Sequence, residues 1–468
     1  MIEPVLRWSN YLLLGYFALL NTGYLAMSLV SFGSLLRYRR LLRAYRPEET
    51  LTSKTLPPIT LIAPAYNEEA TCIESTRAFL SLDYPNFDVL VVNDGSSDAT
   101  LDRLREAFEL ERAPRSPTAT LDTAEVRAVY RSQIHPNLWV IDKENGGKAD
   151  ALNVGINFCQ TPYFCAMDAD TLIEGEGLVR MVRPFLEERS TVAVGGIVRA
   201  VNGSRVRSGR VQEVSMPRRW LPKLQVLEYL RAFLFGRVGW DALGAMLIIS
   251  GAFGLFRRKT VVDVGGYSTD TVGEDMELVV RMHRRLREAN EPYKIRFVPD
   301  PVAWTEVPST LRVLGSQRDR WQRGLTETMI RHQRMLFNPR YGRIGLIAYP
   351  FFYVLETFGP VLEFLGYIVF FISLALSILS APFAIAFFMV AFMLGLALSL
   401  SAVALEEFSF RRYEDSRDFA QLLVLPFVET FGYRQLNAWW RIKGLWSYLR
   451  SEEGWGVMER TGFNTSDG

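Results

Sequence analysis

The chain has 468 residues, of which 49% are hydrophobic and 22% are charged, and its formal net charge is only +2. This length allows two or three structural units, and the small net charge gives no global basic field that would favour nucleic acid as a partner. The three cysteines, Cys72, Cys159 and Cys165, show no CxxC spacing. Their number and spacing argue against a disulfide framework and against a zinc site.

An uncharged run at residues 11–36 stands near the start of the chain. It exceeds the roughly 20 apolar residues that a spanning helix needs, and no small-residue cleavage site follows it, so we expect residues 1–36 to form a retained transmembrane helix. Arginines concentrate on its C-terminal side: Arg37, Arg39, Arg40, Arg43 and Arg46. The positive-inside rule therefore places the basic linker at 37–57, and the region after it, in the cytoplasm.

The middle of the chain alternates short apolar segments with helical stretches. The expected strands are 60–63, 89–92, 138–141, 164–167, 191–194 and 295–298. The expected helices between them are 69–82, 98–110, 148–159 and 177–188. This alternation predicts an α/β domain with a mostly parallel sheet, in which ligands bind beyond the carboxyl ends of the strands. The insertion at 112–136 has the composition of a flexible loop.

Polar segments follow the first four of these strands: "PAYNEE", "NDGSSD", "DKENGGKAD" and "DAD". A turn followed by a helix N-cap would explain "NDGSSD" without any function. In "GGKAD", Gly146 and Gly147 open a helix whose first turn carries Lys148. Unbonded backbone N–H groups and a lysine at that place predict an anion site suited to a diphosphate.

The "DAD" segment places Asp168 and Asp170 two residues apart at a strand end. Carboxylates at this spacing, without nearby His or Cys, favour Mg²⁺ or Mn²⁺ over zinc. Magnesium is usually held by one or two carboxylates together with substrate phosphates, which fits an anion site on the neighbouring strand. An exposed acidic turn would give the same three letters.

A second acidic segment, "GED", stands where a helix is expected to begin. Leu278, Val279 and Met282 follow at helical spacing, so Glu274 and Asp275 lie in the first turn. An acid at this place stabilises the helix dipole, and the functional alternative for Asp275 is a general base. Earlier in the chain, an arginine cluster at 199–219 fits either nucleic acid or a solvated loop facing anionic lipid, and the lipid interpretation is favoured.

The C-terminal part is strongly apolar again, and residues 360–405 contain Glu363 as their one charged residue. This run is long enough for two spanning helices, with a hinge near residues 380–382. We expect interfacial helices at 344–358 and 420–433, because these segments are short or are interrupted by prolines and glutamates, with a re-entrant segment as the alternative for 420–433. Residues 344–405 would then form an interfacial helix and a transmembrane hairpin, and residues 406–468 a cytoplasmic amphipathic tail.

Six motifs in order, "PAYNEE", "VVNDGSSD", "GGKADALN", "DADT", "VGED" and "QRDRW", followed by membrane helices, resemble the membrane-bound processive family 2 glycosyltransferases. These include cellulose, chitin, hyaluronan and poly-N-acetylglucosamine synthases. The resemblance runs from about Ile59 to Leu325. The tail segments "YRQLNAWWRIKGLW" and "GWGVMERTGF" resemble the bacterial poly-N-acetylglucosamine-synthase-like branch more weakly. The resemblance implies a GT-A-type domain, with a nucleotide-sugar-binding half at 58–205 and an acceptor and catalytic half at 206–343, plus about three transmembrane helices.

The resemblance also implies roles for individual residues. Asp275 matches the general base, with Glu274 beside it, although the first position of the family's Thr-Glu-Asp motif is Gly273 here. The residues implied to bind the nucleotide sugar are Pro64, Ala65, Tyr66, Asn67, Glu68, Asp94, Lys148, Asp168, Gln317 and Arg320. The residues implied to contact the acceptor are Trp321, Ser250 and Gly251. Asp170, with Asp168, is implied to hold Mg²⁺ or Mn²⁺.

The implied activity is inverting, metal-dependent transfer of a sugar, N-acetylglucosamine or a related hexose, from a UDP-sugar to a growing β-linked polysaccharide. Transfer would be coupled to export at the cell inner membrane, where a homo-oligomer or an accessory subunit would complete the channel. One alternative is non-processive transfer of a single sugar to a lipid or short acceptor. A second alternative is a catalytically silent nucleotide-binding membrane protein.

Overall fold

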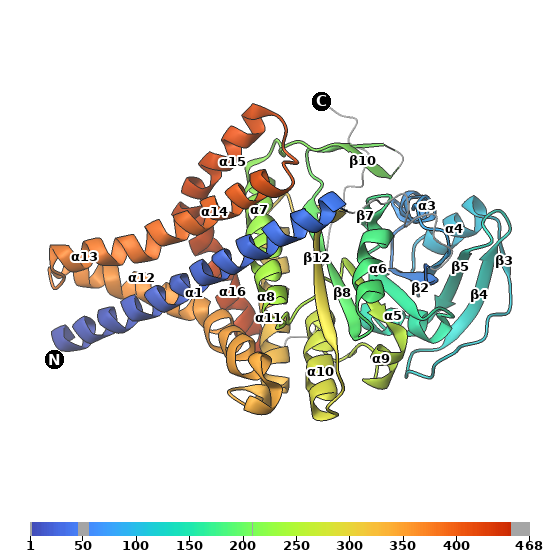
Figure 1. Ribbon diagram of the computed structural model, residues 1–468, viewed down its shortest axis with the longest axis horizontal. Coiled ribbons are helices and arrows are strands. Elements are labelled where there is room, and N and C mark those ends of the chain that lie inside the picture. Colours follow the sequence, from blue (N-terminus) through green and yellow to red (C-terminus); the bar gives the residue numbers. More distant parts are fainter. Residues whose placement is uncertain (1, 45–55, 208, 451–468) are drawn as a thin grey trace. The chain divides into compact units, whose positions relative to one another are not determined.

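The computed structural model describes residues 2–44, 56–207 and 209–450, and these residues form two compact units (Figure 1). The sheet unit comprises Leu41–Ser215 and Gly244–Val307, and the helical unit comprises Met1–Arg40, Met216–Leu243 and Pro308–Val457, as far as these residues are described. Arg46 of the expected basic flank and the tail motif at 454–463 lie outside the described residues.

A ten-stranded sheet forms the core of the sheet unit, with the strand order β3-β4-β5-β2-β1-β6-β11-β8-β12-β7. Its strands are β1 (Ile59–Ala65), β2 (Phe87–Asp94), β3 (Leu110–Arg112), β4 (Val126–Ser132), β5 (Leu138–Lys143), β6 (Tyr163–Met167), β7 (Thr171–Ile173), β8 (Thr191–Ala200), β11 (Phe253–Arg257) and β12 (Lys294–Thr305). A separate two-stranded ribbon pairs β9 (Arg205–Arg207) with β10 (Arg210–Glu213).

The expected strands are confirmed, and seven of the ten strands of the sheet run in one direction, although antiparallel pairs outnumber parallel pairs by five to four. All six expected segments are strands, and they run in one direction, because β5-β2-β1-β6 and β8-β12 pair in parallel while β11 lies antiparallel to both β6 and β8. Strands β4, β11 and β7 run the opposite way and make the sheet mixed. The central strands are buried apolar runs, as expected for a sheet covered on both faces.

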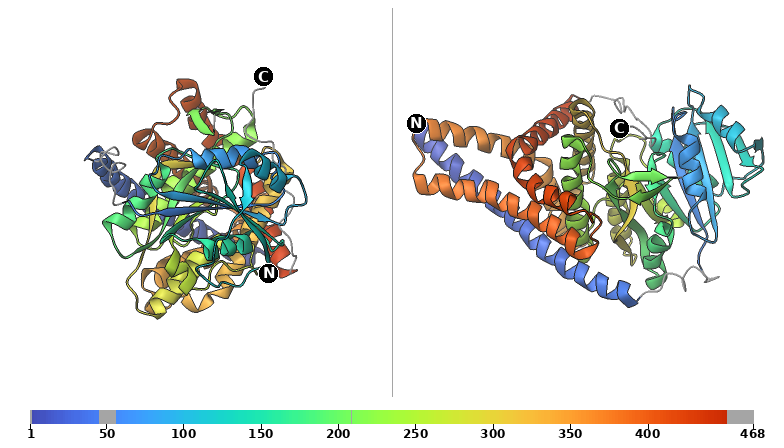
Figure 2. Two further views of the ribbon diagram at one scale, coloured as in Figure 1. Left: turned by 90° about the vertical axis from the view of Figure 1, so that its right-hand side faces the viewer. Right: turned by 90° about the horizontal axis from the view of Figure 1, so that it is seen from above.

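The helices of the sheet unit are α3 (Cys72–Leu80), α4 (Thr100–Ala107), α5 (Lys148–Phe158), α6 (Gly177–Glu187), α9 (Arg258–Asp263) and α10 (Glu274–Glu288). The four helices expected between the strands are confirmed, with shorter ends. Helix α4 ends early because Glu109 adopts a left-handed φ of 47° and the chain then enters β3. The connection from β1 to β2 contains α3 and runs towards one edge of the sheet, whereas the connection from β5 to β6 contains α5 and runs in the opposite direction. Because such connections are right-handed, α3 and α5 lie on opposite faces of the sheet (Figure 2).

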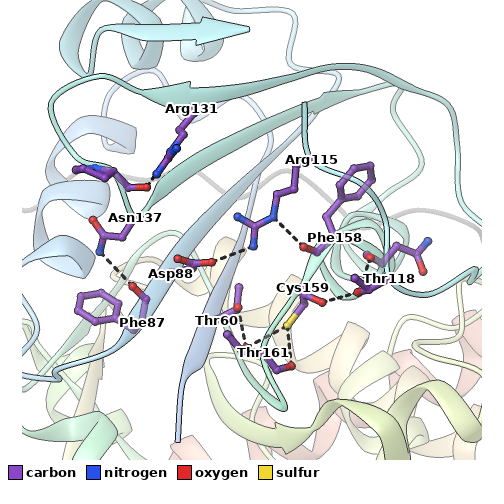
Figure 3. Close-up of polar contacts among 12 residues, drawn as sticks. Thr60, Phe87, Asp88, Arg115, Thr118, Arg131, Asn137, Phe158, Cys159 and Thr161 are labelled. Atoms are coloured by element: carbon purple, nitrogen blue, oxygen red, sulfur yellow. Dashed lines mark hydrogen bonds and ion pairs between the residues drawn. The ribbon is translucent and has the colours of Figure 1, made fainter. Parts of the chain in front are cut away.

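The insertion at 112–136 is not a flexible loop, and that expectation was wrong. The segment begins at the last residue of β3, contains all of β4, and is held against α5 between the two strands. Arg115 is buried and donates to the Asp88 carboxylate at 2.9 Å and to the Phe158 carbonyl at 3.0 Å (Figure 3). Its guanidinium carbon lies 4.5 Å from the Trp139 ring centroid. The amide of Asn157 exchanges two hydrogen bonds with the Leu121 backbone, at 2.8 and 2.9 Å. These bonds satisfy the backbone of a segment that has few ladder partners.

The helical unit begins with α1 (Ile2–Ala44). Its middle part consists of α7 (Trp220–Tyr229), η1 (Leu230–Arg237), α8 (Val238–Ala242), α11 (Leu311–Arg331), η2 (Gln333–Met335), η3 (Pro339–Tyr341), η4 (Ile344–Ala348) and η5 (Phe351–Thr357). The rest is α12 (Gly359–Ala375), α13 (Ala381–Phe388), η6 (Met389–Met393), α14 (Leu394–Ser409), α15 (Ser416–Val428), η7 (Glu429–Tyr433) and α16 (Arg434–Leu449). The η segments are short 3₁₀ or π-helical stretches, mostly continuous with an α-helix.

Among the residues that the structure describes, two helices of this unit are long and apolar enough to cross a membrane, Glu3–Arg40 and Ala381–Ser409. Ile344–Thr357 and Gly359–Ala375, bent by 47°, make a third if the pair is one span. The expected number of about three spanning helices is confirmed if the bent pair is counted as one span. The hinge expected near residues 380–382 falls where α12 ends and α13 begins. The three elements pack side by side (Figure 2), since Asn10 of α1 donates to Ser373 of α12 at 2.7 Å and Asn21 donates to the Val390 carbonyl at 3.1 Å. The interfacial placement of residues 344–358 and 420–433 stays a prediction.

Candidate active site

Lys148 lies at the centre of a charged cluster at the carboxyl ends of the strands in the sheet unit. It is the first residue of α5, directly after the glycine pair, and its side chain is 20% exposed. Its Nζ forms an ion pair with Asp168 and lies 3.5 Å from the Glu274 carboxylate. Three separate elements, the end of β6, the start of α5 and the start of α10, therefore meet at one ammonium group.

Asp275 is held in a fixed orientation beside this cluster. One carboxylate oxygen accepts the backbone N–H of Gly251 at 3.0 Å, and the other accepts the N–H of Met276 at 2.8 Å. A Cβ at position 251 would lie 3.1 Å from the Lys148 Nζ and 3.6 Å from the Asp275 Oδ2. Glycine is thus what lets the turn after Ser250 approach both charged groups.

Burial and mutual repulsion shift the pKa values of two acids in the cluster. Glu274 is 4% exposed, and burial, with the charges of Asp275 and Asp168, raises its pKa to about 7 against the opposing effect of Lys148. Burial, with the charges of Asp168 and Glu306, raises the pKa of Asp170 to about 7. Burial disfavours the charge of Lys148, but the neighbouring carboxylates outweigh it and raise the lysine pKa above its ordinary value. Near neutral pH the cluster therefore contains acids that can gain or lose a proton.

Asp168 and Asp170 lie on the turn that joins β6 to β7, where the Thr171 N–H donates to the Asp168 carbonyl at 3.1 Å. Among the residues that the structure describes, no group of three or more His, Cys, Asp or Glu side chains is arranged to hold a metal. Two carboxylates still fit Mg²⁺ or Mn²⁺, because these ions take the rest of their ligands from water and substrate phosphates.

The glycine pair before Lys148 is organised differently from the expectation. The N–H groups of Gly146 and Gly147 donate to the Asp94 carboxylate at 3.0 and 2.8 Å, so they are not unbonded donors for a diphosphate. Asp94 is 3% exposed and also forms an ion pair with the buried Lys143, which lies 2.7 Å from Asp150. In this arrangement Asp94 shapes the loop that presents Lys148.

The "PAYNEE" segment ends β1 and continues into a loop that interlocks with the "NDGSSD" loop. Pro64 and Ala65 are the last residues of β1. Asn67, at a left-handed φ of 54°, accepts the Ser97 N–H at 2.9 Å, and the buried Glu68 accepts the hydroxyl of Thr71 at 2.7 Å. Tyr66 is 52% exposed. Of these residues, Tyr66 presents the side chain best placed to meet a ligand.

The "QRDRW" residues belong to the helical unit, where they lie on α11. Gln317 and Arg320 are half-buried, and Trp321 is 45% exposed. Arg318, the second residue of the motif, is 3% exposed, and its guanidinium carbon lies 4.2 Å from the Trp321 ring centroid. Within this unit the motif therefore presents an indole that rests on a buried cation.

Two buried ionic residues were missed from the sequence, Lys143 and Asp150. Both stand in the quoted segment "DKENGGKAD", so the signal was a lysine and an aspartate flanking the glycine pair. Their roles depend on Asp94, which is 49 residues before Lys143, and such a pairing follows only from the parallel register of β2 with β5, in which Asp94 lies opposite Lys143.

The comparisons with known proteins agree with this fold. Residues 163–400 match the family described as Glycosyl transferase family group 2, and residues 60–117 match Glycosyl transferase family 2. The first match alone spans half of the chain. The chain belongs to the family 2 glycosyltransferases, and it is a glycosyltransferase.

Two relatives are named poly-beta-1,6-N-acetyl-D-glucosamine synthase. The protein from Staphylococcus aureus strain COL is 31% identical over 279 residues, which are 59% of this chain and 56% of the relative. The protein from Staphylococcus epidermidis is 30% identical over 274 residues, 58% of this chain and 56% of the relative. The alignments thus span little more than half the length of these relatives.

A mannosyltransferase of Pyrobaculum calidifontis, solved in complex with GDP-Man and Mn²⁺, has the same fold. The two structures superpose with a TM-score of 0.50 at 20% identity, covering 93% of this chain and all of the other. This likeness supports the GT-A-type fold, and the two or three apolar helices support association with a membrane.

Proposed function

We propose that the protein transfers a sugar, N-acetylglucosamine or a related hexose, from a UDP-sugar to a growing β-linked polysaccharide, with inversion at the anomeric carbon. The observation that carries this proposal is the cluster of Lys148, Asp168, Glu274 and Asp275 around Gly251. It combines a cation for a leaving phosphate with an oriented carboxylate for an attacking hydroxyl. The names of the two relatives support N-acetylglucosamine as the donor sugar.

Asp275 takes the proton from the acceptor hydroxyl. Its two bonds to backbone N–H groups fix its orientation, and each carboxylate oxygen keeps a lone pair that can accept a proton. Glu274 lies next to it with a pKa of about 7, so Glu274 is partly protonated at neutral pH and adds less than a full negative charge beside the base. The acceptor oxygen then attacks the anomeric carbon while the bond to the diphosphate breaks.

Lys148 stabilises the negative charge that develops on the departing diphosphate. It lies in the first turn of α5 and remains charged because carboxylates surround it. Asp170 and Asp168 would hold Mg²⁺ or Mn²⁺, which would supply charge stabilisation to the leaving group when bound. Pro64 to Glu68 and Asp94 would form or support the nucleotide pocket, and Gln317, Arg320 and Trp321 keep the diphosphate and acceptor roles that the family resemblance implies.

The setting of this reaction is also part of the proposal. The arginines after α1 support a catalytic unit on the cytoplasmic side of the cell inner membrane, with the chain crossing that membrane several times. The two or three apolar helices in the described part of the chain are few for a complete polysaccharide channel, so we propose that a second copy or an accessory membrane subunit contributes to export. Non-processive transfer to a lipid or short acceptor would use the same cluster, and product length distinguishes it.

The test uses the purified full chain in detergent with a panel of UDP-sugars, with Mg²⁺, with Mn²⁺ and with chelator. Metal-dependent release of UDP with one donor, together with products of many sugar units, is the expected result. Products of one added sugar would replace the processive version with the non-processive one. Tight UDP binding without turnover, even with native membrane lipids and candidate subunits present, would favour the catalytically silent alternative.

A further inference from the structure

The indole of Trp321 rests on the guanidinium of Arg318 within α11. The two residues are three positions apart and therefore share one face of the helix. The guanidinium carbon lies 4.2 Å from the ring centroid, which is within the range of a cation–π contact. Arg318 is 3% exposed while Trp321 is 45% exposed, so the contact is desolvated on the arginine side and the ring keeps surface for a ligand.

Arg318 is fixed in turn by Glu228 on α7. The guanidinium donates to the Glu228 carboxylate at 2.8 Å. The same carboxylate accepts the Tyr433 hydroxyl at 2.9 Å and the Asn437 amide at 3.3 Å. One carboxylate therefore joins α7, α11, η7 and α16, and three donors bond to its two oxygens.

The donors Tyr433 and Asn437 belong to the tail segment "YRQLNAWWRIKGLW", which the proposed reaction leaves without a role. Helix α16 from this segment packs closely along α11. A Cβ at Gly315 would lie 2.7 Å from the Trp440 Nε1, and Arg441 donates to the Gln322 side chain at 2.7 Å. Contacts at Gly315 and Gln322, on either side of Trp321, thus fix the position of α16 along α11.

An apolar cluster would stabilise the same helix packing at least as well as this ion pair, because both charges had to be desolvated. What an apolar cluster could not supply is a flat, cationic support for an indole. A guanidinium can donate to a carboxylate with its edge and stack on an aromatic ring with its face, which an ammonium group cannot do.

We propose that the Glu228–Arg318 pair, supported by Tyr433 and Asn437, is a positioning device that orients Trp321 for the glycan acceptor. The inference rests on the proposed function, in which Trp321 stacks on a sugar of the acceptor. Arg318 and Glu228 act through Trp321 and are positioning residues. Their effect should appear in acceptor affinity and not in the affinity for the donor.

The experiment uses the full chain in detergent and isolates the fluorescence of Trp321. Each variant is measured with and without the added Trp321→Phe change, and the difference is the Trp321 signal. Arg318→Lys and Arg318→Met are compared with the parent and with Arg312→Lys, an exposed position on the same helix. Acrylamide quenching reports how well the indole is held, and titration with an N-acetylglucosamine pentamer reports acceptor affinity. UDP release without the pentamer is measured in parallel.

We expect both Arg318 variants to increase the quenching of Trp321 and to weaken pentamer binding by about threefold to thirtyfold, the range of a desolvated cation–π contact. Arg318→Lys keeps a positive charge beside Glu228, so this variant separates loss of Trp321 orientation from loss of protein folding. In Arg318→Lys the KM of the donor should stay within about twofold of the parent value. Unchanged quenching of Trp321 in both variants would overturn the proposal. Pentamer affinity equal to that of the parent in Arg318→Lys would also overturn it. So would a Trp321 signal in the parent protein that does not respond to the pentamer. UDP release failing with every donor while the pentamer still binds at Trp321 would instead defeat the proposed function alone.

Discussion

Replacing Glu274 by Gln should stabilise the sheet unit more at pH 8 than at pH 5.5. The Glu274 side chain is 6% exposed, and burial raises its pKa from an ordinary 4.5 to about 7. The folded protein therefore holds this proton more tightly than the unfolded chain does, so the free energy of unfolding falls as the pH rises from 4.5 to about 7. At 1.36 kcal/mol for each pH unit, ionisation of Glu274 costs the parent about 3 kcal/mol above that window. The glutamine variant does not pay this cost.

The assay is thermal unfolding of the detergent-purified protein at pH 5.5, 7 and 8, with Glu106→Gln on the exposed surface of α4 as the matched control. For a unit of this size about 3 kcal/mol corresponds to a gain of roughly 6–12 °C in Tm at pH 8, and the gain should shrink at pH 5.5. The control should show no such dependence on pH. A gain that is the same at all three pH values, or larger at pH 5.5, would refute the account of the cluster.

Three further outcomes follow from the contacts of the site. Asp94→Asn removes a partner of the buried Lys143 and should lower the free energy of unfolding by about 3 kcal/mol in chemical denaturation, whereas Asp102→Asn, exposed on α4, should change it by less than about 0.5 kcal/mol. Gly251→Ala places a methyl group 3.1 Å from the Lys148 Nζ, so UDP release should fall roughly tenfold to hundredfold while Tm changes by only a few degrees. Unaltered turnover would show that the close approach of residue 251 to Lys148 does not matter for the reaction. Arg115→Met should increase proteolysis within residues 113–125, and an unchanged cleavage pattern would show that this arginine does not hold the insertion.

The sequence was informative about the centre of the sheet, where burial on both faces requires continuous apolar runs. All six strands expected from such runs are present. The missed strands had weaker signals. Strand β4 is a short apolar segment interrupted by two arginines, inside a region whose proline, serine and threonine content indicated a loop, and β7 has only three residues. Strand β11 follows a glycine-containing turn without a clear boundary in the sequence.

The candidate site was predictable where residues follow strand or helix ends. Lys148, Asp168, Glu274 and Asp275 were expected from such positions, and the structure brings them together. The use of the glycine N–H groups by Asp94 was not predictable, because it depends on the register of β2 with β5 and on the buried Lys143. The order of the insertion was hidden for the same reason, since its partners Asp88 and Asn157 are distant in sequence.

The most direct test of the proposed mechanism is UDP release by the Asp275→Asn variant, compared with the parent protein under the same donor and metal. Asparagine can still accept the Gly251 N–H but cannot take a proton, so the variant should fold as the parent does. Turnover should fall roughly a hundredfold to ten-thousandfold, with little change in the KM of the donor. Turnover close to that of the parent in a folded Asp275→Asn protein would contradict the assignment of Asp275 as the base.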